Sequence, residues 1–155
     1  MGKNKSINET DSFWKIRAAK YDKLYWTKDN NYLSEIVNLG DLKKHHLALD
    51  VGTGTGAIAG SINKYVRHVV AIDTSNDMLE KGNWTGISTV KWNIGDSIFI
   101  DSTFHRVFAR MVSHHILDNL GRAIIRCYDL LKDRGKIIVA EGVPRSNDPD
   151  VLELR

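Results

Sequence analysis

The chain has 155 residues, of which 42% are hydrophobic and 26% charged, and its 22 basic and 19 acidic side chains leave a net charge of +3. This length and balance predict one globular domain with a substantial core and exclude a disordered or fibrous chain. The apolar runs are only as long as strands, so we expect no membrane span or signal peptide. The sequence has no basic patch with interleaved aromatic residues, so we expect no nucleic acid partner.

The only cysteine, Cys127, excludes an intrachain disulfide and is consistent with a reducing cytoplasm, where we expect the protein to act. It lies on the apolar side of a predicted helix, which favours a small buried hydrophobe. A catalytic thiol is the alternative.

The first part of the chain is predicted to contain a polar tail and two helices. Residues 1–10 are polar and predicted to be flexible, so the domain is assigned to residues 11–155. Helical spacing of apolar residues indicates a first helix, at Trp14, Ala18, Tyr21 and Tyr25. A second helix carries Leu33, Ile36 and Val37 and is expected to end at Gly40.

From residue 47 onward, short apolar runs alternate with helical patterns. The predicted strands span residues 47–51, 68–72, 88–92, 106–112 and 136–143, and the predicted helices span residues 57–66, 75–81 and 116–132. The last helix is the clearest, because one apolar face continues through Ile124, Cys127 and Leu131 until Gly135 ends it. This alternation predicts an α/β fold, a three-layer sandwich with a mostly parallel sheet of about five strands and helices on both faces.

The strongest signal is a glycine-rich turn between the strand 47–51 and the next helix. Asp50 is followed closely by Gly52, Thr53, Gly54 and Gly56. Glycine allows the positive φ angles of a tight strand-to-helix turn and leaves no Cβ in the way of a ligand lying on the backbone. Ligands of open α/β sheets bind outside the carboxyl ends of the strands, so we expect a ligand at this turn. A turn without a ligand is the alternative.

Two further acids follow the next two strands. Asp73 closes the second strand at the offset expected of a ribose-binding acid, because a carboxylate can accept hydrogen bonds from both hydroxyls of a ribose. Asp96 follows the third strand, where it can accept from an adenine amino group while a backbone N–H near Ser97 meets a ring nitrogen. Each acid alone is more often a cap or a solvated turn, but three acids on successive strands together predict a nucleoside-bearing ligand.

Residues 12–143 resemble the class I S-adenosylmethionine-dependent methyltransferases, which have a Rossmann-like fold. Their first motif, an acid followed by Gly-x-Gly-x-Gly, is matched in full at residues 50–56, and Asp73 and Asp96 match their next two acids. The branch of quinone-biosynthesis methyltransferases looks closest, because it often has a Tyr-Asp pair like the one at Tyr21 and a His-His-Ile stretch like the one at residues 114–116.

The resemblance implies that the chain binds S-adenosylmethionine, transfers its methyl group to a small-molecule acceptor and releases S-adenosylhomocysteine. The positions implied to hold the cofactor are Asp50, Gly52, Thr53, Gly54, Gly56, Asp73, Thr74, Met78, Gly95, Asp96, Ser97, Arg110 and Tyr21. His114 and His115 are candidates for contacting the acceptor or moving a proton, with local packing as the alternative. We expect no metal, because no Cys-x-x-Cys or spaced His–carboxylate set accompanies them.

The chain departs from the family pattern in three places. His105 stands where the family has an aspartate, and residues 133–135 replace its Pro-Gly-Gly; both lie away from the expected cofactor contacts. The family's sheet continues through two more strands after the fifth. We therefore expect a C-terminally truncated domain whose fifth strand is an exposed edge through which the chain dimerises or aggregates.

Two other functions stay open at this point. Gly52, Gly54 and Ala57 also satisfy a relaxed dinucleotide pattern, and Asp73 would suit the ribose of NAD in an oxidoreductase. Against this, the charge of Asp50 repels a pyrophosphate but attracts the ammonium and sulfonium of S-adenosylmethionine. The chain could also be a non-catalytic module that keeps the cofactor pocket without an acceptor site.

Overall fold

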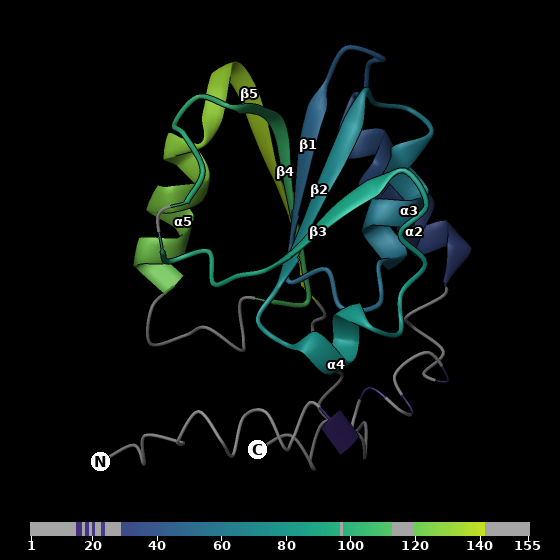
Figure 1. Cartoon of the computed structure of the whole chain (residues 1–155). Helices are drawn as coiled ribbons and strands as arrows, with labels where there is room; N and C mark the ends of the chain where they lie inside the picture. The colour runs from purple at the N-terminus through teal and green to yellow at the C-terminus, as the bar shows by residue number, and fades with distance from the viewer. Residues whose placement is uncertain are drawn as a thin grey trace, which may run out of the picture.

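The computed structural model describes residues 29–96, 98–112 and 120–141, together with residues 15, 16, 18, 20 and 23. Helices and strands alternate along these residues, as the sequence predicts, except that β4 follows β3 directly (Figure 1). The elements are, in chain order, α2 (Asn30–Leu39), β1 (Leu47–Val51), α3 (Ala57–Asn63), β2 (His68–Asp73), α4 (Asn76–Leu79), β3 (Ile87–Lys91), β4 (Phe104–Arg110), α5 (Leu120–Asp129) and β5 (Leu131–Ala140).

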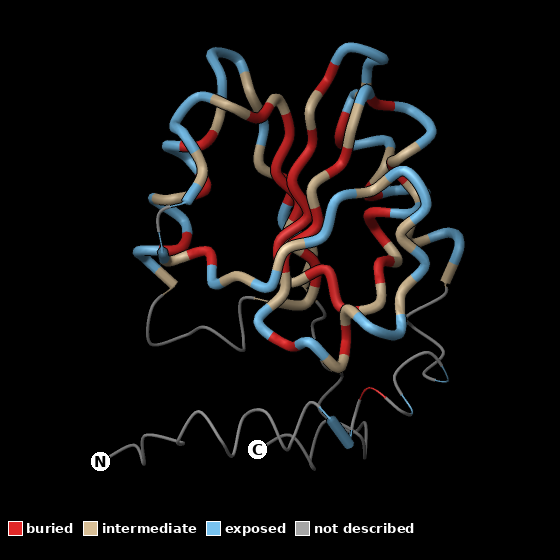
Figure 2. Tube along the Cα trace, in the orientation of Figure 1, coloured by how far each residue is buried: buried red, intermediate tan, exposed pale blue. Residues whose placement is uncertain are grey.

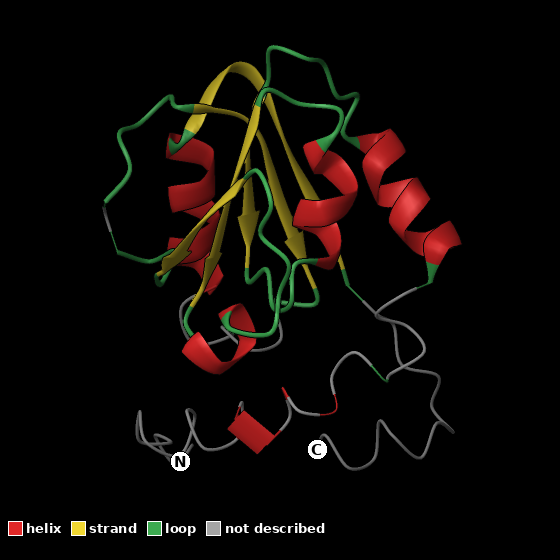
Figure 3. Cartoon of the chain, turned by 45° about the vertical axis from the view of Figure 1, so that its right-hand side comes forward, coloured by secondary structure: helices red, strands yellow, loops and turns green. Residues whose placement is uncertain are grey.

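The five strands form one sheet in the order β3-β2-β1-β4-β5, and every neighbouring pair is parallel. α2 and α3 cover one face of the sheet, and α5 covers the other (Figures 1 and 3). β1 lies in the centre, so Asp50 is opposite Ala71 on β2 and Phe108 on β4. The predicted three-layer, Rossmann-like α/β fold is confirmed.

Apolar side chains fill both spaces between the sheet and its helices. Figure 2 marks the buried residues in red. Successive side chains of a strand point to opposite faces. Ala48 and Phe108 therefore pack in the cluster under α2 and α3, whereas Leu49 and Val107 pack in the cluster under α5. Each large side chain buried in this way contributes about 1.5–3 kcal/mol to the stability of the fold.

Most element boundaries agree with the sequence prediction. α2 starts where the Oδ1 of Asp29 accepts from the backbone N–H groups of residues 31 and 32, and it ends before Gly40 as expected. α3 ends at Asn63, earlier than the predicted residue 66. Ser75 caps α4 as predicted, because its Oγ accepts from the N–H of Met78 at 3.3 Å.

The largest difference lies between α5 and β5. The helix ends at Asp129 and the strand begins at Leu131, whereas the sequence predicts helix to residue 132 and strand from residue 136. The apolar periodicity continues beyond the end of the helix, because Leu130 is buried in the core and Leu131 packs against it although neither is helical. Ile124, predicted on the apolar face of the helix, is 52% exposed.

Gly135 does not end a helix but lies in an irregular part of β5. Phe104 pairs with Leu131 and Arg106 with Lys136, so β5 has three more residues than β4 between these two pairs. Arg134 takes up the extra length with a φ of 59°. The irregularity lets the chain pass from α5 into the sheet without a separate loop.

Some expectations lie outside the described residues. They are the tail 1–10 and the part of the first predicted helix that contains Trp14, Tyr21 and Tyr25. Where the chain is described, no helix has both the length and the apolar character needed to cross a membrane.

Candidate functional site

The carboxyl ends of β1, β2 and β3 lie next to one another at one edge of the sheet, the lower edge in Figure 1. Asp50 lies near the end of β1, Asp73 ends β2, and Asp96 comes shortly after β3. The parallel sheet thus brings the three acids that the sequence singles out to the same edge.

Asp50 lies beneath the glycine turn and is only 1% exposed. Its Oδ2 accepts from the hydroxyl of Thr53 at 2.6 Å and from the backbone N–H of Ala59 at 3.1 Å. Burial raises the pKa of Asp50 to about 7, although these two hydrogen bonds act in the opposite direction. Asp50 therefore ties the turn to the first turn of α3 and holds a titratable group in a dry environment.

Asp73 holds the same turn from the second strand. Its Oδ2 accepts from the N–H of Gly54 at 2.8 Å, and its Oδ1 accepts from the N–H of Ser75 at 2.9 Å. Burial raises the pKa of Asp73, while the hydrogen bonds from Ser75, Gly54 and Thr74 lower it. Asp73 is only half-buried, and each carboxylate oxygen has two lone pairs, so it can still accept from the hydroxyls of a ligand.

Two glycines of the turn touch side chains of the protein itself. Gly52 has a φ of +64°, and a Cβ there would lie 2.1 Å from Cγ2 of Val112. Gly56 has a φ of +90°, and a Cβ there would lie 2.7 Å from the ring of Trp84. From the sequence, we expect these positions to be glycine because a ligand lies against the backbone. The structure shows a second reason, which is close packing against side chains that are far from the turn in the sequence.

The other predicted cofactor residues that the structure describes surround this edge. Gly95 and Asp96 form the turn after β3, in which the N–H of Gly95 donates to Oδ1 of Asn93 at 3.0 Å and Asp96 is exposed. Thr74 is exposed between β2 and α4, and Met78 is buried in α4.

Arg110 ends β4 and is buried, with its guanidinium 5.1 Å from the centre of the Tyr32 ring on α2. A guanidinium over an aromatic face is a favourable cation–π contact. Its charge also acts to lower the pKa of Asp50. The remaining predicted site residues, Tyr21, Ser97, His114 and His115, lie outside the described residues.

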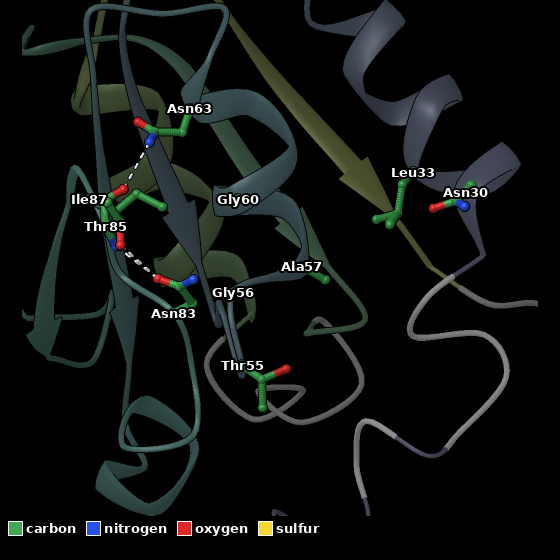
Figure 4. A pocket seen from close by; sticks show the side chains of 10 residues that line it. All are labelled: Asn30, Leu33, Thr55, Gly56, Ala57, Gly60, Asn63, Asn83, Thr85 and Ile87. Atoms are coloured by element: carbon green, nitrogen blue, oxygen red, sulfur yellow. Dashed lines mark hydrogen bonds between the residues drawn. The ribbon is translucent and has the colours of Figure 1, made fainter.

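A hollow of about 630 Å³ opens beside the turn, between α2, α3 and residues 83–87 (Figure 4). Its lining is rich in amide side chains and small residues and consists of Asn30, Leu33, Thr55, Gly56, Ala57, Gly60, Asn63, Asn83, Thr85 and Ile87. The three acids do not line it. The hollow therefore borders the glycine turn without containing the acids.

The two local departures from the family pattern lie at the opposite edge of the sheet, as expected. His105, at the start of β4, accepts from the N–H of Leu47 through Nδ1 at 3.0 Å and stacks on His46 with ring centres 5.0 Å apart. Residues 133–135 form the irregular part of β5. Neither departure touches the glycine turn.

Residues 49–139, more than half of the chain, match the family described as a methyltransferase domain. The chain belongs to this methyltransferase family. It is 24% identical over 116 residues to the uncharacterized methyltransferase YcgJ of Bacillus subtilis (strain 168), a match that covers 70% of this chain and 46% of that protein. It is 26% identical over 144 residues to an uncharacterized methyltransferase of Alkaliphilus oremlandii (strain OhILAs), covering 84% of this chain and 66% of that protein.

A solved structure shows the same fold. A DhpI–SAM–HEP complex superposes with a TM-score of 0.77 at 16% identity, over 99% of this chain and 73% of that one. The chain spans 46% and 66% of the lengths of the two curated relatives, so it corresponds to roughly half to two thirds of such a methyltransferase.

The predicted cofactor, S-adenosylmethionine, is the one that this methyltransferase family uses, and nothing in these comparisons supports the NAD-dependent alternative. The described residues fit such a ligand. Asp73 has lone pairs left for ribose hydroxyls, Asp96 is exposed at the same edge, and Asp50 places a second carboxyl group under the turn.

Proposed function

We propose that the protein transfers the methyl group of S-adenosylmethionine to a small-molecule acceptor. The observation that carries the proposal is that Asp50 and Asp73 both bind one glycine turn, from two adjacent strands. Two carboxyl groups at one turn favour a ligand with positive charge and sugar hydroxyls over a ligand with a pyrophosphate.

Bound S-adenosylmethionine supplies a methyl group on a positively charged sulfur. In this chain, Asp73 would accept hydrogen bonds from the ribose and Asp96 would accept from the adenine amino group. Asp50, whose pKa is raised to about 7 by burial, would contribute negative charge beneath the turn when it is ionised. Their main task is to orient the ligand, because proximity and alignment supply most of the reduction of the barrier. His114 and His115 remain our candidates for holding the acceptor or accepting a proton from it.

Calorimetric titration with S-adenosylhomocysteine and with NAD tests the cofactor site. We expect S-adenosylhomocysteine to bind and NAD not to bind. Asp73→Ala should weaken the affinity at least about tenfold, because charged hydrogen bonds worth about 1.5–3 kcal/mol are lost. Asp77→Ala, which removes an acid from the nearby α4, is the matched control and should change the affinity little. Unchanged affinity in a folded Asp73→Ala protein would remove Asp73 from the site.

Methylation assays with quinones, phenols and small amines test the acceptor class. Turnover with one of these classes supports the proposal. Cofactor binding without turnover on any of them would favour the alternative, a non-catalytic cofactor-binding module.

We also propose that the chain dimerises through β5 and acts in the cytoplasm. Among the described residues, β5 is the edge strand of the sheet and Val139 on it is 54% exposed, so these residues offer a backbone edge and an apolar side chain that a second copy could contact. Light scattering should show a dimer that Val139→Lys weakens; a monomeric mass of the unmodified chain at high concentration would contradict this. The cytoplasmic part of the proposal is supported by the sequence, whose single cysteine, Cys127, gives no intrachain disulfide.

A further inference from the structure

The amino ends of four neighbouring strands form a second edge of the sheet, the upper edge in Figure 1, opposite the glycine turn. We define this amino edge as residues 41–46, 64–67, 101–106 and 129–136, which lead into or begin β1, β2, β4 and β5. These segments carry four acidic and eight basic side chains, the basic ones being Lys43, Lys44, Lys64, Arg67, Arg106, Lys132, Arg134 and Lys136. The amino edge is therefore more positive than the whole chain, whose net charge is +3.

The four segments form one continuous surface, because hydrogen bonds join each of them to a neighbour. These bonds run from Arg67 N to His46 O (2.9 Å), from Leu47 N to His105 Nδ1 (3.0 Å) and from Ser102 N to Asp129 O (2.9 Å). All the basic residues of the amino edge except Arg106 are exposed. The positive charge thus faces solvent as a single patch.

The acids of the amino edge compensate this charge only in part. Asp41 is the shared counter-ion of three cations, lying 4.0 Å from Lys43, 3.7 Å from Arg106 and 3.9 Å from Lys136. One carboxylate cannot neutralise three cations. The pKa of the neighbouring His46 is lowered to about 4, first by burial and then by Arg106 and other positive groups, as expected where positive charge is in excess.

The exposed rings of the amino edge indicate the kind of polyanion that fits. Tyr65 is 42% exposed with the Nζ of Lys64 4.9 Å from its ring centre, and His45 is exposed beside His46. Within the described structure, Tyr65 is the only exposed large hydrophobic side chain of these four segments; Tyr128 and the aliphatic Leu39 and Ile100, exposed just beyond the segment bounds, are single residues in separate parts of the chain. A lipid surface needs aliphatic side chains to insert. Planar rings next to lysines suit the stacked bases and phosphates of a nucleic acid.

We propose that the amino edge binds a single-stranded nucleic acid, with phosphates on its exposed lysines and arginines and bases on Tyr65 and His45. This site lies opposite the cofactor site, so the inference does not depend on the proposed methyl transfer. The sequence does not reveal the patch, because its cations come from four segments that only folding brings together.

Fluorescence anisotropy with a labelled oligouridine of about 12 nucleotides, titrated at salt concentrations from about 50 to about 200 mM, tests the proposal. The test variant is Lys43→Gln/Arg67→Gln/Lys132→Gln, whose positions are exposed on three different segments. The matched control is Lys81→Gln/Lys91→Gln/Arg122→Gln, which removes the same charge from exposed positions elsewhere. Circular dichroism and thermal unfolding check that both variants fold.

We expect salt-dependent binding with a Kd of about 1–100 µM. The amino-edge variant should bind at least about tenfold more weakly, with a salt slope smaller by about 2, whereas the control should lose less than about threefold. If the two variants lose the same affinity for the oligonucleotide, the binding depends only on net charge and the proposal is overturned. Absence of binding at low salt would also overturn it, as would binding to phosphatidylserine–phosphatidylcholine vesicles without binding to the oligonucleotide.

Discussion

Asp50→Asn is expected to stabilise the fold at alkaline pH. Each tenfold change in proton affinity is worth about 1.4 kcal/mol. A pKa of about 7 in the folded chain, against an ordinary value of 3.8 for an aspartate, means that ionised Asp50 costs the fold about 4 kcal/mol above pH 7. Because the folded state holds this proton more tightly, the cost is absent below about pH 4 and grows as the pH rises to about 7.

Asparagine keeps the shape and one oxygen for Thr53 and Ala59 but carries no charge. Its amide nitrogen adds a buried hydrogen-bond donor without a good acceptor, which lowers the stability of the variant by about 1–3 kcal/mol at every pH. The informative quantity is therefore the stability of the variant minus that of the unmodified chain, measured by urea unfolding at pH 5 and at pH 8. We expect this difference to grow by about 2–3 kcal/mol in favour of Asp50→Asn at pH 8. A difference that is the same at both pH values would refute the assignment of a buried, titrating Asp50.

Three further predictions concern stability and reactivity. Gly52→Ala should lower the unfolding free energy by about 2–4 kcal/mol, through its positive φ and its clash with Val112, and adding Val112→Ala should restore part of it. The pKa of His46 is about 4 in the folded chain, against an ordinary value of 6.5. His46 therefore adds up to about 3 kcal/mol to the free energy of unfolding above pH 6.5, and this contribution is lost as the pH falls to about 4. The variant His46→Asn should not show this loss when its urea unfolding is measured over the same pH range. Burial raises the pKa of Cys127 to about 11, so its thiol should react with a disulfide reagent at pH 8 only after unfolding, and rapid reaction of the folded chain would contradict this.

The sequence is sufficient to predict that Asp50, Asp73 and Asp96 lie at the same edge of the sheet. This succeeds because each acid lies at the end of its own apolar run, and parallel strands bring such ends together. The same local signals predict the cap at Ser75 and the end of α2. In these places, neighbouring residues alone decide the structure.

The predictions fail where distant residues decide. The boundary of α5 shifts because Leu131 pairs with Phe104 instead of continuing the helix. Val112 fills the space at Gly52, although 60 positions separate them in the sequence. The shared counter-ion Asp41 and the patch around it likewise arise only when four separate segments meet.

Trp84 joins the glycine turn to the segment that enters β3. Its ring lies against Gly56 and Gly82, and its Nε1 donates to the carbonyl oxygen of Leu79 at 2.6 Å. An indole held this way senses any displacement of the turn through its surroundings. Trp84 is thus a fluorophore packed against the glycine turn, and in a variant whose three other tryptophans are replaced its emission can report a displacement of the turn without an attached dye.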